Sequence, residues 1–237
     1  MDNRAYYDQF APSYENERHH GYHALIDQLE MSIVLPYVEG ARVLEAGCGT
    51  GMILKEVAPR TRQAVGIDIS PGMLATARGR GLDVVNASVT HIPFPDGHFD
   101  LAYSFKVLAH VERIGTAMAE LTRVVRPGGH VIAEFYNPWS LRYLVKRLKR
   151  PTRISGGTTD ESVFTRYDSL STVRRYLPPP LEVIDLHGVR VVTPFSQVHN
   201  LPYLGRAVAA LEWQARSAPL LRRLGGFLVV VARKRAG

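Results

Sequence analysis

The sequence has a single cysteine and no long hydrophobic run, and both absences exclude classes of protein. The one thiol, Cys48, cannot form an intramolecular disulfide, which is compatible with a reducing compartment. No run approaches the roughly eighteen apolar residues of a membrane span, and the first residues lack the apolar core of a signal peptide. We therefore expect a cytoplasmic protein without a membrane span. Neither repeats nor a long linker divide the 237 residues, so one domain over 1–237 is expected.

The formal net charge of +7 is unevenly distributed. The leucines and the valine of residues 139–153 recur at helical spacing, which predicts an amphipathic helix. We interpret its basic residues as the solvated face of a lid helix. The alternative is attraction to an anionic substrate, or weak association with an anionic lipid surface. No nucleic-acid-binding module accompanies this stretch, so a nucleic acid is not an expected partner. The basic residues are Arg142, Lys146, Arg147, Lys149, Arg150 and Arg153.

Apolar runs alternate with helical patterns, which predicts an α/β fold with a doubly wound sheet of seven strands. Residues 203–216 have helical spacing between the last two strands. We interpret this region, as part of 193–224, and residues 138–165 as small helical cap insertions that face a substrate. The strands are expected near residues 42–45, 64–68, 83–86, 99–105, 130–136, 181–192 and 226–233.

The most specific motif is the glycine-rich turn of residues 47–51, which follows an apolar strand that ends in Glu45. Glycines permit positive φ and let backbone N–H groups approach a ligand at the start of the next helix. The turn therefore predicts a nucleoside site. Dinucleotide-binding folds use a similar G-x-G-x-x-G loop, but Met52 stands where their last glycine belongs. The turn therefore leaves an NAD(P)-dependent oxidoreductase as the alternative function.

Further segments, taken in order and spacing, resemble the class I S-adenosylmethionine-dependent methyltransferases. Within that class the sequence is similar to the small-molecule group of ubiquinone- and menaquinone-biosynthesis enzymes. The resemblance is dense from about residue 7 to residue 137 and looser afterwards. It implies a Rossmann-like, mostly parallel sheet whose last strand enters antiparallel between the fifth and the sixth. It also implies S-adenosylmethionine as the cofactor and residues 1–35 as lid helices. The segments are 43–51, 64–74, 84–88, 91–101, 103–111 and 126–131.

The resemblance implies a set of cofactor-binding residues. Glu45 orders the loop and the methionine end, Gly47 and Gly49 pass closest to the cofactor, and Asp68 accepts hydrogen bonds from the ribose hydroxyls. The full set is Tyr14, Glu45, Gly47, Cys48, Gly49, Gly51, Asp68, Ile69, Met73, Ser88, Val89 and Ser104.

Some of these residues also have a plain structural interpretation. Ser88 stands where the family commonly has an aspartate for the adenine amino group, so we expect weaker cofactor binding. This departure is also the hint for a third hypothesis, a cofactor-binding protein that is non-catalytic or repurposed. Tyr14 would cover the cofactor and attract its sulfonium through cation–π contact, or would be ordinary helix packing. Cys48 is interpreted as a small buried filler, and Ile69 and Met73 could equally belong to the core.

Four residues are candidates for catalysis. His110 follows the fourth strand, where relatives face the acceptor, and is the leading general base; the alternative is that it caps or packs the next helix. His19 and His23 share a helical face and could place a base under the lid. Nothing near them completes a metal site, so no metal is expected. Glu134 is an acid inside an apolar strand, where a charge must be paired or functional. Weaker candidates are Tyr136, Asn137, Tyr167 and His199.

A methyl group on a sulfonium is already activated, so the enzyme's task is to align a nucleophile and exclude water. We expect transfer to a small, partly apolar molecule, with oxygen preferred over nitrogen or carbon. A hydroxyl acceptor benefits from a base, whereas a carboxylate needs none. The protein is expected to act as a monomer or a homodimer.

Overall fold

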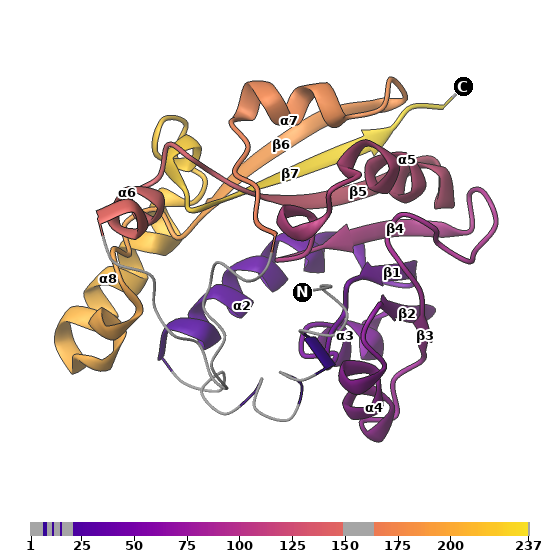
Figure 1. The fold of residues 1–237 in the computed structure, drawn as a ribbon, viewed down its shortest axis with the longest axis horizontal. Helices are drawn as coiled ribbons and strands as arrows, with labels where there is room; N and C mark the ends of the chain where they lie inside the picture. The colour runs from indigo at the N-terminus through magenta and orange to yellow at the C-terminus, as the bar shows by residue number, and fades with distance from the viewer. Residues whose placement is uncertain (1–6, 9–10, 12–14, 16–20, 149–163, 237) are drawn as a thin grey trace.

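The computed structural model describes residues 7–8, 11, 15, 21–148 and 164–236. Within them one sheet has the strand order β3-β2-β1-β4-β5-β7-β6, and helices cover both of its faces (Figure 1). β7 is antiparallel to both of its neighbours, while β1 to β5 run parallel. The predicted Rossmann-like α/β fold with its antiparallel last strand is confirmed. The strands are β1 Arg42–Ala46, β2 Gln63–Asp68, β3 Val84–Asn86, β4 Phe99–Ser104, β5 Val125–Tyr136, β6 Leu181–Val189 and β7 Phe227–Lys234.

Successive strand residues point to opposite faces, and each face has its own core. Val43 and Ile132 lie in the cluster that α2 completes, whereas Leu44 lies in the cluster that α5 and α7 complete. Both faces of the sheet are thus buried, which explains the continuous apolar runs of its strands. The helices are α2 Gly21–Val34, α3 Leu54–Val57, α4 Pro71–Gly79, α5 Ile114–Val124, α6 Leu141–Leu148, α7 Leu170–Tyr176 and α8 Pro202–Ala215.

The parallel strands β1, β2, β4 and β5 end at one edge of the sheet, where open α/β sheets bind ligands. Figure 1 shows α6 and α8 together at the left, away from β1 to β3. α2 contacts α8 and the short helix Ser196–Asn200. In the part of the chain that the structure describes, no helix combines the length and the apolar character needed to cross a bilayer.

Two strand boundaries differ from the prediction by more than one residue, for local reasons. β6 ends at Val189, three residues early, because Arg190 has a left-handed φ of +58° and the amides of residues 191–193 donate to the Glu212 carboxylate. β5 begins at Val125, earlier than expected, because the Pro-Gly-Gly segment forms a bulge in the strand. Its pairing with β4 shifts register between Phe99 and Leu101.

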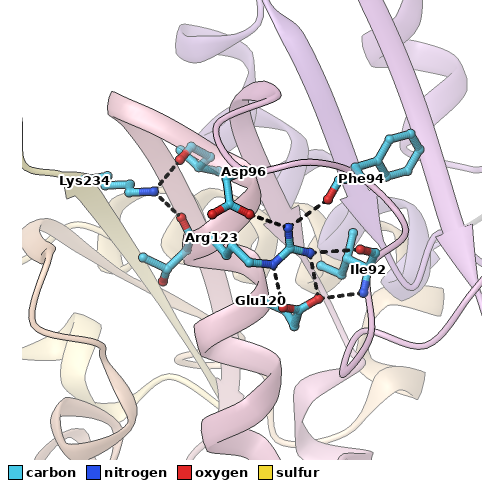
Figure 2. A network of polar contacts seen from close by, with 8 residues as sticks. Ile92, Phe94, Asp96, Glu120, Arg123 and Lys234 are labelled. Carbon is cyan, nitrogen blue, oxygen red and sulfur yellow. Dashed lines mark hydrogen bonds and ion pairs between the residues drawn. The ribbon is translucent and has the colours of Figure 1, made fainter.

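The segment that follows β3 is fastened to α5 by one arginine (Figure 2). Arg123 donates to both Glu120 oxygens, at 2.7 and 2.9 Å, and to Asp96 at 2.8 Å. It also donates to the carbonyls of Ile92 and Phe94, at 2.9 and 2.8 Å. The segment Ile92-Pro93-Phe94, which lies in the range 91–101 of the family resemblance, is therefore an anchored loop.

Candidate functional site

The glycine turn lies at the carboxyl end of β1 and is tied to β2. The N–H groups of Gly47 and Cys48 donate to the Ile67 carbonyl, at 2.7 and 2.9 Å. A Cβ at Gly47, where φ is +81°, would lie 2.1 Å from Val107 Cγ2. A Cβ at Gly49, where φ is +53°, meets nothing within 4 Å. Gly47 therefore makes room for a protein side chain, and the open space of the turn lies at Gly49.

Asp68 stands directly beside this open space. One carboxylate oxygen accepts a hydrogen bond from Gly49 N at 2.9 Å, and the other accepts one from Ser70 N at 2.9 Å. Burial raises the pKa of Asp68, while the bonds from the Ser70 and Gly49 amides oppose this shift. The structure thus brings together the glycine turn and the acid that the sequence singled out.

Two other residues of the turn are buried. Burial raises the pKa of the Cys48 thiol, and a Cβ at Gly66 would lie 2.6 Å from its sulfur. Cys48 is therefore a tightly packed filler, as interpreted. Likewise, a Cβ at Gly51 would lie 2.3 Å from Leu82 Cδ1. Glu45 accepts a hydrogen bond from the Tyr103 hydroxyl at 3.0 Å, and burial raises its pKa to about 8.

The remaining candidates for the cofactor lie around β2, β3 and β4. Ile69 is half-buried beside Asp68, whereas Met73 and Val89 are buried, at 2% and 5% exposure. The Ser88 hydroxyl lies 2.8 Å from the Thr90 hydroxyl and accepts from Thr90 N. Buried Ser104 donates from its hydroxyl to the Ala46 carbonyl at 2.8 Å. Their roles toward the cofactor stay predictions.

Two described residues of the amino-terminal segment contact both ends of α4. Asp8 accepts hydrogen bonds from the Ser70 hydroxyl at 2.6 Å and from Gly72 N at 3.0 Å, next to the start of α4. Glu15 forms an ion pair with Arg80. The lid predicted for residues 1–35 stays a prediction, and Tyr14 and His19 lie outside the described residues.

His110 is held in one orientation after β4. Its Nδ1 lies 2.8 Å from the Phe164 carbonyl, which can only accept, so Nδ1 carries the proton and Nε2 carries the lone pair of the neutral ring. The ring contacts Tyr7 and Tyr136, with centroids 6.4 and 5.6 Å away. Burial, together with the charges of Arg142 and Lys146, lowers the pKa of His110. The imidazole is therefore neutral near pH 7 and can accept a proton.

Glu134 is buried in a charged network that the sequence did not predict. One oxygen accepts from Lys106 N at 3.0 Å, the other has no hydrogen-bond partner in the described part of the chain, and the charge of Glu30 acts on the group. The Lys106 ammonium donates to Glu30 and Asp27, each at 2.8 Å. Burial raises the pKa of Glu134 well above its ordinary value. Glu134 is thus paired, and its catalytic role stays a prediction.

The predicted orientation of α6 is wrong. Leu141 and Leu144 of its apolar stripe are 39% and 56% exposed, whereas Arg142 is half-buried over the Tyr136 ring. Cation–π contact with aromatic rings favours this arrangement over a solvated arginine. In the sequence, only its place in the basic stretch of residues 139–153 indicated a special role for Arg142.

The sequence did not indicate the roles of Tyr22, near the start of α2, and of Arg190, which follows β6. Tyr22 accepts a hydrogen bond from Arg190 at 3.0 Å, although 168 positions separate them. Its ring lies 5.1 Å from that of His23 and 5.9 Å from that of His199. His23 therefore lies beside this pair, and its role as a base stays a prediction.

A family model described as a methyltransferase domain matches residues 44–133. Residues 44–133 are thus similar to a methyltransferase domain. The match runs from β1 through the glycine turn, Asp68 and His110 into β5. The carboxyl-terminal strands and the segments around α6 and α8 lie beyond the matched residues.

Curated relatives agree with that assignment over a limited length. The demethylmenaquinone methyltransferase of Thermus thermophilus is 43% identical over 110 residues, which are 41% of this chain and 48% of that protein. The malonyl-[acyl-carrier protein] O-methyltransferase of Serratia marcescens is 34% identical over 107 residues, or 44% of this chain and 42% of that protein. The chain thus spans about half the length of these relatives.

A solved structure shows that the fold extends over the whole chain. An S-adenosylmethionine-dependent methyltransferase of Thermotoga maritima, described as a possible histamine N-methyltransferase, superposes with a TM-score of 0.70. The comparison covers 97% of this chain and 98% of that one at 17% identity, so it concerns the fold alone.

S-adenosylmethionine is the cofactor that the family resemblance implies, and the residues of the turn fit it. Gly49 leaves open space that a nucleoside could occupy, and the Asp68 carboxylate beside it can accept hydrogen bonds from a ribose diol. Half-buried Ile69 offers apolar surface for a base. When bound, the cofactor supplies an activated methyl group.

Proposed function

We propose that this protein transfers a methyl group from S-adenosylmethionine to a small, partly apolar molecule. The observation that carries the proposal is the pairing of Gly49 with Asp68 at the carboxyl edge of the sheet, inside the residues that match a methyltransferase domain. Two relatives are named for different acceptors, demethylmenaquinone and malonyl-[acyl-carrier protein]. The acceptor must therefore be argued from this chain's own residues.

Oxygen is the preferred acceptor atom because His110 can take up a proton. Its Nδ1–H is engaged with the Phe164 carbonyl, so Nε2 is the basic nitrogen of the neutral ring. The rings of Tyr7 and Tyr136 beside it offer an apolar wall to the acceptor. A general base of this kind accelerates transfer to a hydroxyl, and its contribution is typically on the order of 10²–10⁴-fold.

The rest of the catalytic effect comes from alignment and from exclusion of water. Asp8 holds described residues of the amino-terminal segment against the start of α4, and we assign this segment the role of a lid. Residues 138–165 and 193–224 would form the cap on the acceptor side. Holding acceptor and donor in a near-attack arrangement can lower the barrier by roughly 7–11 kcal/mol.

Methyl transfer is tested by incubating the protein with isotopically labelled S-adenosylmethionine and a panel of phenols, amines and small acids. The expected result is one product molecule, heavier by the labelled methyl, for each S-adenosylhomocysteine released. With S-adenosylmethionine below its wild-type Kd, Asp68→Ala should lower the yield of both products about ten-fold or more, and Asp83→Ala, which alters an exposed aspartate before β3, should not. Binding of NAD(H) in place of S-adenosylhomocysteine would contradict the proposal.

A further inference from the structure

Two arginines from distant segments meet at the carboxyl edge of the sheet. Arg142 lies on α6, after β5, and Arg190 directly follows β6. A Cβ at Gly226 would lie 3.0 Å from Arg142 Cδ and 3.4 Å from Arg190 Cβ. The missing side chain at Gly226 thus makes room for both arginines.

Arg142 is supported by aromatic rings and uses little of its hydrogen-bonding capacity. Its guanidinium carbon lies 4.6 Å from the ring centroid of Tyr136, 5.0 Å from that of Phe227 and 5.9 Å from that of Tyr167. The single hydrogen bond runs from Nη1 to the Tyr167 hydroxyl and is long, at 3.5 Å. A guanidinium has five N–H donors, so most of those on Arg142 donate to no described group.

Arg190 is fixed more firmly. It donates to the Tyr22 hydroxyl at 3.0 Å and to the carbonyls of Pro194 and Thr193 at 3.2 and 3.3 Å. Its φ of +58° is a conformation that costs free energy for a residue with a side chain. Burial and the nearby Arg142 charge lower its pKa. The chain therefore holds this guanidinium in place beside a like charge.

Among the described residues, no carboxylate oxygen lies within 4.0 Å of either guanidinium. Arg166, by contrast, forms an ion pair with Asp168 at 2.8 Å. The Glu212 charge acts on Arg190, but its oxygens accept from the amides of residues 191–193. Neighbouring, partly buried cations without a counter-ion raise the free energy of the site, and a bound anion lowers it.

We propose that Arg142 and Arg190 bind an anionic group of the methyl acceptor, which makes the acceptor a small apolar or aromatic acid. This inference rests on the proposed function. The planar guanidinium groups match a carboxylate or a phosphate, and half-buried Tyr22 and Tyr167 leave aromatic surface beside them. The Tyr136 ring contacts both Arg142 and His110, so an acid held on Arg142 extends toward the base.

The test is calorimetric titration of protein saturated with S-adenosylhomocysteine. The probes are hydroxybenzoates, the matched neutral hydroxybenzamides, and phenyl phosphate. An acid should bind at least about 10-fold more tightly than its amide. Arg142→Gln and Arg190→Gln should each remove most of this preference, and Arg142→Lys should retain part of it. Arg147→Gln, on the exposed side of the same helix, should retain all of it.

The outcomes separate this inference from the proposed function. Failure of the wild type to bind S-adenosylhomocysteine contradicts the function itself, whereas binding by each variant shows that its fold is intact. If S-adenosylhomocysteine binds but no acid is preferred over its amide, or if the preference survives in both glutamine variants, the anion site is overturned. Preference for the phosphate over the carboxylate, or the reverse, supports the site and identifies the oxyanion.

Discussion

Glu30 on α2 and Glu134 on β5 are both buried and are both bonded to Lys106: its ammonium donates to Glu30 Oε2 at 2.8 Å and its backbone N–H donates to Glu134 Oε1 at 3.0 Å. Neither Glu30 Oε1 nor Glu134 Oε2 has a hydrogen-bond partner in the described part of the chain. Burial, together with the charge of Glu30, raises the pKa of Glu134. Lys106 therefore joins the amino-terminal helix to the central strand through two carboxyl groups that hold protons more readily than ordinary glutamates.

This pair predicts a specific pH dependence of stability. Burial raises the pKa of both carboxyl groups, so the folded state binds more protons than the unfolded state above the ordinary glutamate value of 4.5. The free energy of unfolding should then fall as the pH rises from that value through the raised pKa. Denaturant titrations at about pH 5, 6, 7 and 8 measure this slope.

Glu134→Gln should flatten that slope, because an amide does not titrate. Glu45, whose pKa is raised to about 8, would still contribute to the remaining decline. Glu39→Gln, at an exposed position, serves as the control. Equal slopes in the wild type and in Glu134→Gln would refute the raised pKa of Glu134.

His110 should titrate below the ordinary histidine value of 6.5, because burial and the charge of Arg142 disfavour the imidazolium. A general base works when neutral, so kcat should rise with pH and level off above this lowered pKa. NMR titration of the ring protons measures the pKa directly. His110→Gln should lower kcat on the order of 10²–10⁴-fold while binding of S-adenosylhomocysteine is retained. His91→Gln, at an exposed position, is the matched variant, and an equal loss in both would contradict the role.

Alanine at Gly47 and at Gly49 should have different effects. At Gly47 the new Cβ meets Val107 at 2.1 Å, so overpacking and strain together should cost about 2–5 kcal/mol of stability. At Gly49 only the backbone strain applies, about 1–2 kcal/mol, but the methyl group enters the open space and should abolish cofactor binding. Thermal denaturation and calorimetry measure the two effects.

A second substitution tests the cause at Gly47. Val107→Ala removes the two methyl groups that the new Cβ meets at 2.1 and 2.9 Å, so the double variant should regain part of the lost stability. No recovery would show that Val107 is not the obstacle.

Arg123→Ala should destabilise the fold by about 2–3 kcal/mol, because it releases Ile92, Phe94 and Glu120 from one side chain (Figure 2). The bond to Arg123 also lowers the pKa of Glu120, so stability from this pair is present near neutral pH and is lost as the pH falls through that lowered value. Chemical denaturation at neutral and at acid pH measures both effects. Arg78→Ala, at an exposed position of α4, should change little, and a comparable loss there would count against the network.

Local sequence features predicted the sheet and the nucleoside turn. The turn is determined by glycines that are neighbours in the chain, and Asp68 ends the next strand, so spacing alone brings Asp68 close to Gly49. The antiparallel direction of β7, by contrast, followed from the family resemblance, because an apolar run has the same pattern in either direction.

The acceptor side could not be predicted in the same way, because tertiary packing assembles it. Tyr22 and Arg190 come from α2 and from the end of β6, and no local pattern relates them. Helical periodicity also gave the wrong orientation for α6, since it predicts that the apolar stripe of the helix packs against the core. Three aromatic rings and the space at Gly226 favour Arg142 in that position instead.

The most direct test of the central claim is calorimetric titration with S-adenosylmethionine and S-adenosylhomocysteine, on the wild type and on Asp68→Ala and Asp83→Ala. The account predicts micromolar binding that weakens about ten-fold or more in Asp68→Ala, about 1.4 kcal/mol, and is unchanged in Asp83→Ala. Absence of binding to both nucleosides in folded wild-type protein would contradict it.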